Sequence, residues 1–496
     1  MIWILYNLLF PVAFLLMLPK FLSRMARRGG YKKHFEQRLG IYGHSTTARL
    51  NEAQRIWIHA VSVGEIHIAL RFIEAYRKEN LGARFVLSTN TSTAHAIGQE
   101  QLDRRDVLIY FPVDLPLVMK RAFDAIRPLK LILVECEFWP NLVRQACKRG
   151  IPVSLINGRI SDSSFRGYMK FRAFTRRLLE MIDPICVQSR QDAERVIAMG
   201  ARPESVHMLG TAKYDLPPPS PNAAVPAHDV LRSLGVSEDA KILLGGSTWP
   251  GEEAVLCQIY KNLRNLYPQL FLVLVPRHAE RREDVQNVIE AQGLSCALRS
   301  QLTHPPRPSG TPPEEGMNVE HPTSNVQHPM QEIPSGEGGA KGGVGSSLDV
   351  LMVDTTGELM SFYAVSDVVF VGKSLCEHGG QNPIEPALFG KAIVVGPNME
   401  NFPSVMDDFL VQGALSQVQD VPALEKTIEK LLTDSAAREQ LGAAAQQVVE
   451  SRRGVIDRMV SLLSGGAVHS EFSGRNIRFL SGKGGGNENS TSVRFV

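Results

Sequence analysis

Short apolar segments alternate with helix-length segments along most of this chain, and this alternation limits the possible folds more than any other feature. Neighbouring parallel strands need a long crossover between them, and that crossover is usually a helix. The alternation therefore predicts an α/β fold built on doubly wound parallel sheets. The expected strands are 56–60, 84–88, 107–111, 131–135, 152–156 and 185–188, followed by 241–244, 271–275, 350–353, 368–371 and 392–395.

A Pro-rich stretch at 217–229 separates the two groups of expected strands. We expect a first Rossmann-like domain at 34–216, this stretch as a linker, and a second Rossmann-like domain at 230–463. A chain of 496 residues is long enough for two such domains. Because ligands bind outside the carboxyl ends of the strands in doubly wound sheets, we expect a ligand cleft between the two domains.

Two segments do not follow the alternation. Residues 301–347 are rich in Pro, Gly, Ser, Glu and His and have few large apolar groups, so they are predicted to be a disordered insertion in the second domain. Residues 464–496 are rich in Gly, Asn and Ser and are predicted to be a flexible tail. The sequence indicates no role for either segment.

The N-terminal residues 2–19 are almost wholly apolar, with Pro11 among them. As a helix they would reach roughly 27 Å, just short of the roughly 30 Å hydrocarbon core of a bilayer. Basic residues follow this segment, whereas a cleaved signal peptide carries them before it. We therefore expect 1–33 to be a membrane anchor with a basic segment, which keeps the body of the protein cytoplasmic. A kinked helix lying in the interface is the alternative, with the same location.

Charge and cysteine content exclude several classes of protein. The formal net charge is only +3, which does not indicate a nucleic-acid partner. The six cysteines are scattered without a Cys-x-x-Cys pair, which argues against a zinc ribbon or a disulfide framework and suits a reducing compartment. We expect no metal site and no cofactor.

Candidate site residues in the first domain follow its expected strands. Glu65 comes after the first strand and starts a helix, where a general base would stand. The alternative is an ordinary first-turn carboxylate that complements the helix dipole. Glu137 follows the strand at 131–135, and Arg159, which follows the next strand, can clamp a carboxylate or phosphate. Lys213, at the domain junction, offers a further positive charge.

In the second domain, the run 379–386 (Gly-Gly-Gln-Asn-Pro-Ile-Glu-Pro) predicts a loop that turns into a helix. Asn382 is expected at the N-cap with Glu385 at N3, which makes a helix start suited to an anion. The alternative is a capping-box variant with no other role. Other polar or Gly-rich turns follow neighbouring strands and predict a nucleotide pocket together with Gly379 and Gly380. These turns contain Ser247, Thr248, Arg277, His278, Gly357 and Glu358.

Residues 165–177 interleave Arg and Lys with Phe, Tyr and Met and predict one helix. Such a helix could rest against anionic lipid headgroups. The alternative is an ordinary solvated helix face.

Five motifs in this order resemble the bacterial 3-deoxy-D-manno-octulosonic acid (Kdo) transferases of lipopolysaccharide synthesis. The resemblance extends from the N-terminal segment to about residue 463, without the insertion. The motifs are 57–65 (Trp-Ile-His-Ala-Val-Ser-Val-Gly-Glu), 135–142 (Glu-Cys-Glu-Phe-Trp-Pro-Asn-Leu), 276–278 (Pro-Arg-His), 357–359 (Gly-Glu-Leu) and 379–386.

The resemblance implies a GT-B glycosyltransferase fold, CMP-Kdo as the donor and a lipid A precursor as the acceptor, at the cytoplasmic face of the inner membrane. It places the general base at Glu65, the ribose contact at Glu385 and the phosphate contacts at Arg277 and the helix start after Asn382. The remaining donor-site residues are Ser247, Thr248, His278, Gly357, Glu358, Gly379 and Gly380. The Kdo and acceptor side is lined by Glu137, Arg159 and Lys213.

The implied reaction is a single displacement that inverts the anomeric carbon, with no metal because the chain lacks an Asp-x-Asp diphosphate motif. Two residues depart from the family pattern: Gln381 stands where His is usual, and Lys373 where Gly is common. Three alternatives remain open. They are another membrane-associated GT-B transferase with a different nucleotide sugar, a sugar-nucleotide epimerase, and a membrane-tethered protein that binds a nucleotide without catalysis.

Overall fold

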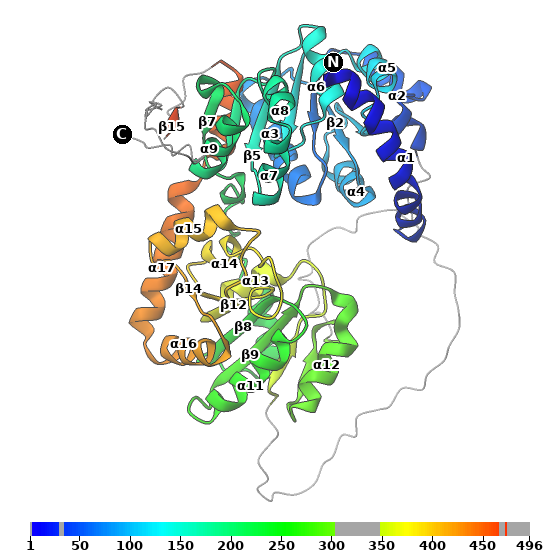
Figure 1. The fold of residues 1–496 in the computed structure, drawn as a ribbon. Helices are drawn as coiled ribbons and strands as arrows, with labels where there is room; N and C mark the ends of the chain where they lie inside the picture. Colours follow the sequence, from blue (N-terminus) through cyan, green and yellow to red (C-terminus); the bar gives the residue numbers. More distant parts are fainter. Residues whose placement is uncertain (1, 29–33, 303–347, 466–471, 474–496) are drawn as a thin grey trace, which may run out of the picture. The chain divides into compact units, whose positions relative to one another are not determined.

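The computed structural model describes residues 2–28, 34–302, 348–465 and 472–473. These residues form two compact units (Figure 1). Unit 1 contains Met1–Pro217 together with Val449–Val496, and unit 2 contains Pro218–Val448. The predicted disordered insertion and most of the predicted tail lie outside the described residues.

Unit 1 is built on an eight-stranded sheet in the order β15-β7-β6-β5-β4-β1-β2-β3. All neighbouring strands are parallel except β15, which pairs with β7 in the antiparallel direction. The prediction of a doubly wound parallel sheet is therefore confirmed here. The strands are β1 (Ile56–His59), β2 (Phe85–Thr89), β3 (Val107–Tyr110), β4 (Lys130–Val134), β5 (Val153–Gly158), β6 (Ile185–Val187), β7 (Val206–Met208) and β15 (Phe472–Ser473).

Helices cover both faces of this sheet because successive strand residues point to opposite sides. On β1, Trp57 packs in one apolar cluster while Ile56 and Ile58 pack in the other. The helices of unit 1 are α1 (Ile2–Arg28), α2 (His44–Asn51), α3 (Val63–Glu79), α4 (Ser92–Gln101), α5 (Pro116–Ile126), α6 (Pro140–Lys148), α7 (Asp162–Lys170), α8 (Arg172–Leu179), α9 (Arg190–Met199) and α18 (Val455–Leu463), with 3-10 turns η1 (Phe35–Leu39), η2 (Pro203–Ser205) and η3 (Ala212–Tyr214).

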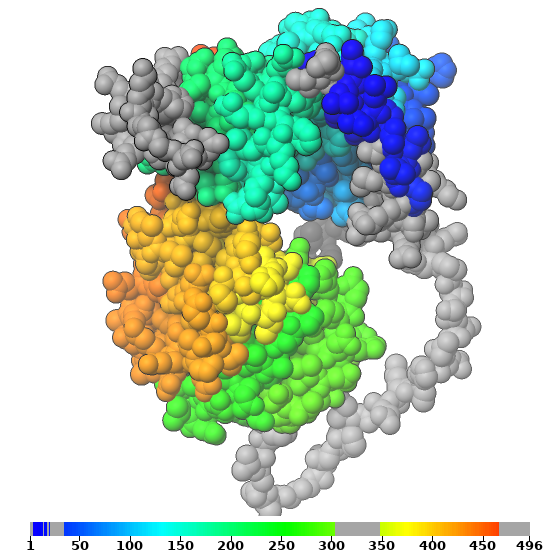
Figure 2. Space-filling model, in the orientation of Figure 1, coloured from blue at the N-terminus to red at the C-terminus, as the bar shows by residue number. Residues whose placement is uncertain are grey.

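The predicted N-terminal helix is present as α1, which docks on unit 1 (Figure 2). The Tyr6 hydroxyl donates to Asp114 Oδ2 at 2.9 Å, and the side-chain amide of Asn141 donates to Asn7 Oδ1 at 2.8 Å. The Trp3 ring meets the edge of Phe174 at 5.2 Å between centroids. Within the described ranges, no helix has both the length and the apolar character needed to cross a membrane.

The single helix predicted at 165–177 is wrong, because the structure has two helices, α7 and α8, which meet at Phe171. This residue leaves the helical region with φ −117° and ψ 35°. The Thr175 hydroxyl donates to the Tyr168 carbonyl at 3.1 Å and so stabilises the bend between the helices.

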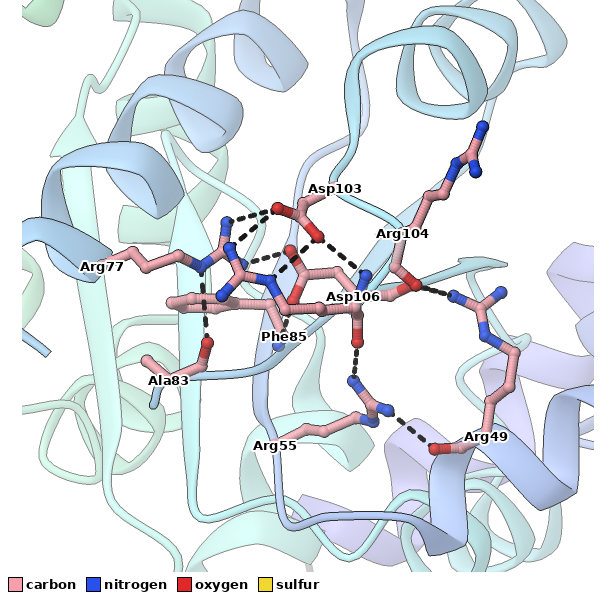
Figure 3. Close-up of polar contacts among 9 residues, drawn as sticks. Arg49, Arg55, Arg77, Ala83, Phe85, Asp103, Arg104 and Asp106 are labelled. Atoms are coloured by element: carbon pink, nitrogen blue, oxygen red, sulfur yellow. Dashed lines mark hydrogen bonds and ion pairs between the residues drawn. The ribbon is translucent and has the colours of Figure 1, made fainter. Parts of the chain in front are cut away.

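A cluster of charged side chains lies at the amino end of the unit 1 sheet (Figure 3). Fully buried Arg55 donates to the carbonyls of Arg49 and Arg105 at 2.7 and 2.6 Å. Buried Asp106 pairs with Arg77 and accepts from the Phe85 amide. These side chains bind backbone groups at the starts of the strands. They therefore stabilise the sheet at the edge opposite the candidate site.

Unit 2 has a seven-stranded, wholly parallel sheet in the order β10-β11-β9-β8-β12-β13-β14. Its strands are β8 (Lys241–Thr248), β9 (Leu270–Pro276), β10 (Cys296–Leu298), β11 (Val350–Met352), β12 (Val368–Val371), β13 (Ala392–Val395) and β14 (Ser416–Gln417). Its helices are α10 (Val225–Ser233), α11 (Glu252–Arg264), α12 (Arg282–Ala291), α13 (Leu359–Val365), α14 (Ile384–Ala387), α15 (Pro403–Val411), α16 (Val421–Thr433) and α17 (Ser435–Arg452), with η4 (Ala279–Arg281) and η5 (Arg299–Gln301). The second predicted parallel sheet is thus confirmed.

Two predicted domain boundaries need correction. The linker predicted at 217–229 contains the first turns of α10, which begins at Val225. The second domain was predicted to extend to 463, but the chain returns to unit 1 at Val449, so α18 belongs there. The physical reason is that α18 packs its apolar face on α3, with Val455 and Met459 in the same buried cluster as Phe72.

Asp215 holds the start of this returning helix. Its two carboxylate oxygens accept the amides of Gly454 and Ile456, both at 2.6 Å. The charge is thus placed at the amino end of α18, where the helix dipole favours it.

Candidate active site

In the unit 1 sheet, the strand order reverses between the neighbouring parallel strands β1 and β4. The chain leaves β1 toward β2 and β3 on one side and returns to β4 on the other, which defines a switch point where ligands bind in such sheets. Glu65 follows β1, while Glu135 and Glu137 follow β4. The fold therefore brings three carboxylates to the carboxyl edge of the sheet at its switch point.

Glu65 lies in the first turn of α3 and is only 5% exposed. Its backbone amide donates to the N-cap hydroxyl of Ser62 at 3.2 Å, and its Oε2 accepts from the Val61 amide at 2.7 Å. This is close to a capping box, so the structural alternative for Glu65 describes a real interaction. Burial nevertheless raises the pKa of Glu65, although the hydrogen bonds from Val61 and Ser62 oppose that shift.

Glu135 and Glu137 form a coupled acidic group with Glu65. Burial first, and then the charge of Glu65, raise the pKa of Glu135 to about 7. The same two causes raise the pKa of Glu137 to about 7, against a hydrogen bond from Trp139. Carboxyl groups with such pKa values can hold or accept a proton at neutral pH, which general acid–base catalysis requires.

Two positively charged side chains lie near the acidic group. Arg159 directly follows β5, and Lys213 lies in η3. Both lower the pKa of Glu135, and burial lowers the pKa of Lys213 to about 8. Asn157, at the end of β5 with φ 54°, accepts the Ala212 amide at 2.9 Å and so fixes the turn that carries Lys213. The structure thus brings together all four site residues predicted in the first domain.

Sequence reasoning missed two contributors to this site. Glu135 was only part of a motif, yet it is the carboxylate on which both cations act. Asp192 accepts the Ile160 amide at 2.7 Å and holds the turn that carries Arg159. The position of Glu135 directly after a strand was a usable signal, whereas Asp192 is distant in sequence and gave none.

The switch point of unit 2 lies between neighbouring strands β8 and β12. Ser247, at the end of β8, has a left-handed φ of 54°, and the Thr248 hydroxyl is buried without a partner among the described residues. Buried Glu252 accepts the amides of Trp249, Lys373, Ser374 and Leu375 at 2.8 to 3.1 Å. One carboxylate therefore joins the turn after β8 to the loop after β12.

The backbone amides of the Gly-Gly turn, at Gly379 and Gly380, make hydrogen bonds within unit 2. The Gly379 amide donates to Glu400 at 2.7 Å, and the Gly380 amide donates to the Lys373 carbonyl at 2.9 Å. Both glycines have left-handed φ, and a Cβ on either would lie within 2.4 Å of Asn401 or Met399. They are therefore required by the fold of the loop.

The helix predicted after Asn382 is the single turn α14, whose N-cap is Pro383. The expected N-cap was thus one residue too early, and a four-residue helix is too short to carry the expected anion site. Asn382 accepts the Ile384 amide at 3.2 Å and donates to Glu385 Oε1 at 3.1 Å. These bonds support the alternative for this motif, a variant of the capping box with no other role.

Glu385 and Arg277 lie close enough to interact electrostatically. Burial raises the pKa of Glu385, while its hydrogen bond from Asn382 and the charge of Arg277 oppose the shift. The fully buried Tyr363 lies beside both, and their charges act on its pKa in opposite directions. Arg277 itself is exposed and lies directly after β9, so its guanidinium can reach a bound anion.

The other predicted donor residues lie at or shortly after the ends of β8, β9 and β11. Glu358 is held by Arg299, which donates to its Oε1 at 2.8 Å, and by the Thr355 hydroxyl. Gly357 has a left-handed φ of 90° in the preceding turn. Exposed His278 meets the Trp249 ring at 5.5 Å, and the Lys373 ammonium lies 4.3 Å above the same ring. Lys373, a departure from the family pattern, thus makes a cation–π contact.

Family models match both units. Residues 33–216 match a model described as 3-Deoxy-D-manno-octulosonic-acid transferase (kdotransferase). Residues 343–448 match one described as Glycosyl transferases group 1. The matched ranges contain the acidic group of unit 1 and the Glu385 loop of unit 2.

A curated relative covers most of the chain. The 3-deoxy-D-manno-octulosonic acid transferase of Haemophilus influenzae is 30% identical over 434 residues, which span 87% of this chain and 91% of that protein. Among solved structures, Anabaena Alr3699/HepE in complex with UDP has a TM-score of 0.53 at 13% identity, with 83% of this chain and all of that chain covered. A putative UDP-N-acetylglucosamine 2-epimerase from Listeria monocytogenes has 0.52 at 11% identity, with 85% and 100% covered. The two structural likenesses concern the fold alone.

Proposed function

Since this chain belongs to the 3-deoxy-D-manno-octulosonic acid (Kdo) transferase family and is a glycosyltransferase, we propose that it takes Kdo from CMP-Kdo. The proposed acceptor is a sugar hydroxyl of a lipid A precursor. The proposed place of the reaction is the cytoplasmic face of the inner membrane. The observation that carries the proposal is the group of three carboxylates, two with a pKa of about 7, at the switch point of the unit 1 sheet.

We assign the general base to Glu65. As the acceptor oxygen attacks the anomeric carbon of Kdo, its proton passes to the Glu65 carboxylate. The new carbon–oxygen bond forms on the side of the anomeric carbon opposite the phosphate. The bond between that carbon and the phosphate oxygen breaks, and its electron pair leaves with CMP. The configuration at the anomeric carbon is therefore inverted. The raised pKa of Glu65 supports this role because the best general bases have a pKa near the working pH.

We assign the departing nucleotide to unit 2. Glu385 accepts hydrogen bonds from the ribose hydroxyls, and Arg277 pairs with the phosphate as its negative charge increases. Arg277 helps catalysis to the extent that it binds the transition state more tightly than the intact donor. Arg159 and Lys213 in unit 1 supply the positive charge that the Kdo carboxylate requires. Transfer needs Glu65 and the Glu385 loop to face one reaction centre, which stays a prediction.

We further propose that α1 holds the protein at the membrane. Its exposed apolar side chains, such as Leu8 and Leu16, support this location because they would otherwise face water. The exposed basic residues of α7 and α8 suit the anionic lipid headgroups of the same surface.

The deciding experiment incubates purified full-length protein and a lipid A precursor with CMP-Kdo and follows the lipid by mass spectrometry. We expect mass additions of whole Kdo residues that require both protein and donor, and that the Glu65→Gln variant does not produce. Parallel reactions with UDP-sugars test the alternative, a GT-B transferase with another donor. A product with a UDP-sugar and none with CMP-Kdo would reject the proposal.

A further inference from the structure

Unit 1 contains a cavity of about 650 Å³ that borders one apolar cluster of the sheet, with Phe138 and Leu178 belonging to both. Its walls are the first turns of α1, the segment between β4 and α6, and the helices α7 and α8. Leu5, Leu9 and Phe10 line it from α1, and Phe171 and Phe174 line it from the α7–α8 side. The volume is within the range of about 300 to 1,000 Å³ that is typical of small-molecule sites.

Several polar atoms around this cavity already have partners within the protein. The Tyr6 hydroxyl donates to Asp114, and the Thr175 hydroxyl donates to the Tyr168 carbonyl. One carboxylate oxygen of Glu137 accepts from Trp139 Nε1 at 2.8 Å. A ligand in the cavity would therefore meet aliphatic and aromatic side chains and find few hydrogen-bonding groups, so the lining selects a hydrocarbon.

Glu137 connects this cavity to the acidic group. Its side chain lines the cavity, and it lies near enough to Glu65 for the charge of Glu65 to raise its pKa. A molecule with its apolar part in the cavity would thus hold its polar part beside the proposed general base.

The outer surfaces of the same helices suit an amphiphile. Leu8, Leu15 and Leu16 are more than half exposed on α1, and Arg166 and Arg177 are exposed on α7 and α8. Apolar and basic side chains together favour an anionic lipid over a neutral water-soluble molecule.

We propose that this cavity binds a hydrocarbon chain of the lipid acceptor, with α1 as one of its walls. The bound hydrocarbon chain thereby positions the acceptor sugar at Glu65. This inference rests on the proposed function for the identity of the lipid, but not for the binding of an alkyl chain.

The binding test uses full-length protein and dodecyl maltoside below its critical micelle concentration, followed by calorimetry. Leu9→Glu puts a charge on the cavity lining, and Leu81→Glu puts the same charge on an exposed residue of unit 1 outside both the lining and α1. We expect at least about tenfold weaker binding for Leu9→Glu, because the bound alkyl chain would cover the new carboxylate and remove it from water, and a change within about twofold for Leu81→Glu. Equal affinities in the two variants would overturn the proposal.

A second measurement needs no cavity variant. Brominated dodecyl maltoside should quench the fluorescence of Trp139, which lines the cavity, and Trp139→Phe should remove that part of the quenching. Quenching that is the same in both proteins would place the alkyl chain elsewhere and reject the inference.

A kinetic comparison separates this inference from the proposed function. Leu9→Glu should raise KM for the acylated acceptor without changing turnover of a deacylated one, whereas Leu81→Glu should change neither. If the alkyl probe quenches Trp139 fluorescence in wild-type protein but the protein transfers no Kdo, the cavity assignment stands and the proposed reaction is wrong. If Kdo transfer is intact and Leu9→Glu changes neither binding nor KM, the cavity assignment is wrong.

Discussion

Glu65 is the residue on which the proposed reaction depends most directly. We expect Glu65→Gln to keep CMP affinity and to lose about 10²- to 10⁴-fold in turnover, because the amide cannot accept the acceptor's proton. Single-turnover kinetics with saturating donor would measure the loss. Glu74→Gln, on the exposed side of the same helix, is the matched control and should retain wild-type rates. Wild-type turnover in Glu65→Gln would end its assignment as the base.

The pH dependence of the reaction should reflect the raised pKa of Glu65. A general base acts only when ionised, so kcat/KM should fall as the pH decreases through a pKa above the ordinary 4.5. Glu65→Gln removes the negative charge that helps to raise the pKa of Glu135 and Glu137 to about 7, so both carboxyl groups should titrate at lower pH in that variant. Titration of these carboxyl groups by NMR in wild type and Glu65→Gln would test this. The same pKa values in both proteins would show that the carboxyl groups are not coupled.

Glu385 and Glu358 were both predicted to bind the donor, but their surroundings differ. Glu385→Ala should weaken CMP binding about tenfold or more in calorimetry, because a hydrogen bond to a charged group contributes about 1.5 to 3 kcal/mol. Glu358→Ala should instead lower the free energy of unfolding, since it leaves buried Arg299 without its carboxylate. Unchanged CMP affinity in Glu385→Ala would contradict the ribose contact.

For single residues, the sequence predicted which side chains lie at the site better than it predicted which hydrogen bonds the neighbouring backbone makes. Glu65, Glu137, Arg159 and Lys213 could be selected because each follows a strand end, where doubly wound sheets collect functional groups. The amides of Gly379 and Gly380 donate to Glu400 and to the Lys373 carbonyl, and such tertiary contacts cannot be inferred from local sequence.

Among the elements, the turn after β8 and the loop after β12 depend on one buried carboxylate. Glu252→Ala leaves four backbone amides without their acceptor, so we expect a loss of about 3 to 5 kcal/mol in the free energy of unfolding. Chemical denaturation would measure it. Glu290→Ala, on the exposed end of α12, is the control and should change stability by less than about 0.5 kcal/mol. Similar midpoints for both variants would show that Glu252 does not hold these loops.

Elements with strong patterns could be predicted, and those without one could not. The buried strands β1, β4, β8 and β12 have the apolar runs that parallel sheets require. Of the strands of two or three residues, β6 and β11 are apolar and fully buried and could be predicted, whereas β7, β10 and β14 lack such a run. The break between α7 and α8 at Phe171 has no Pro or Gly to mark it.

For the whole molecule, two parallel sheets could be predicted, but not that the chain returns to the first unit. The amphipathic pattern of α18 suits packing on either sheet, so sequence alone does not assign it. The contacts that decide are its burial with α3 and the two amide hydrogen bonds to Asp215.

Removing the returning segment should destabilise unit 1. A chain ending at residue 448 would expose the apolar face of α3 that α18 covers, including Phe72. We expect increased binding of a hydrophobic dye and an earlier thermal transition than in a chain ending at 465. Identical melting profiles would show that unit 1 does not need α18.

The same arrangement gives the protein a long delay during its synthesis. Strands β1 to β7 of unit 1 leave the ribosome well before α18, and the roughly 250 residues in between take on the order of 10 to 50 s to translate. During that interval a nascent first sheet carries one uncovered apolar surface. A chaperone that binds nascent chains would find its substrate there, and the packing of α18 on α3 would release it.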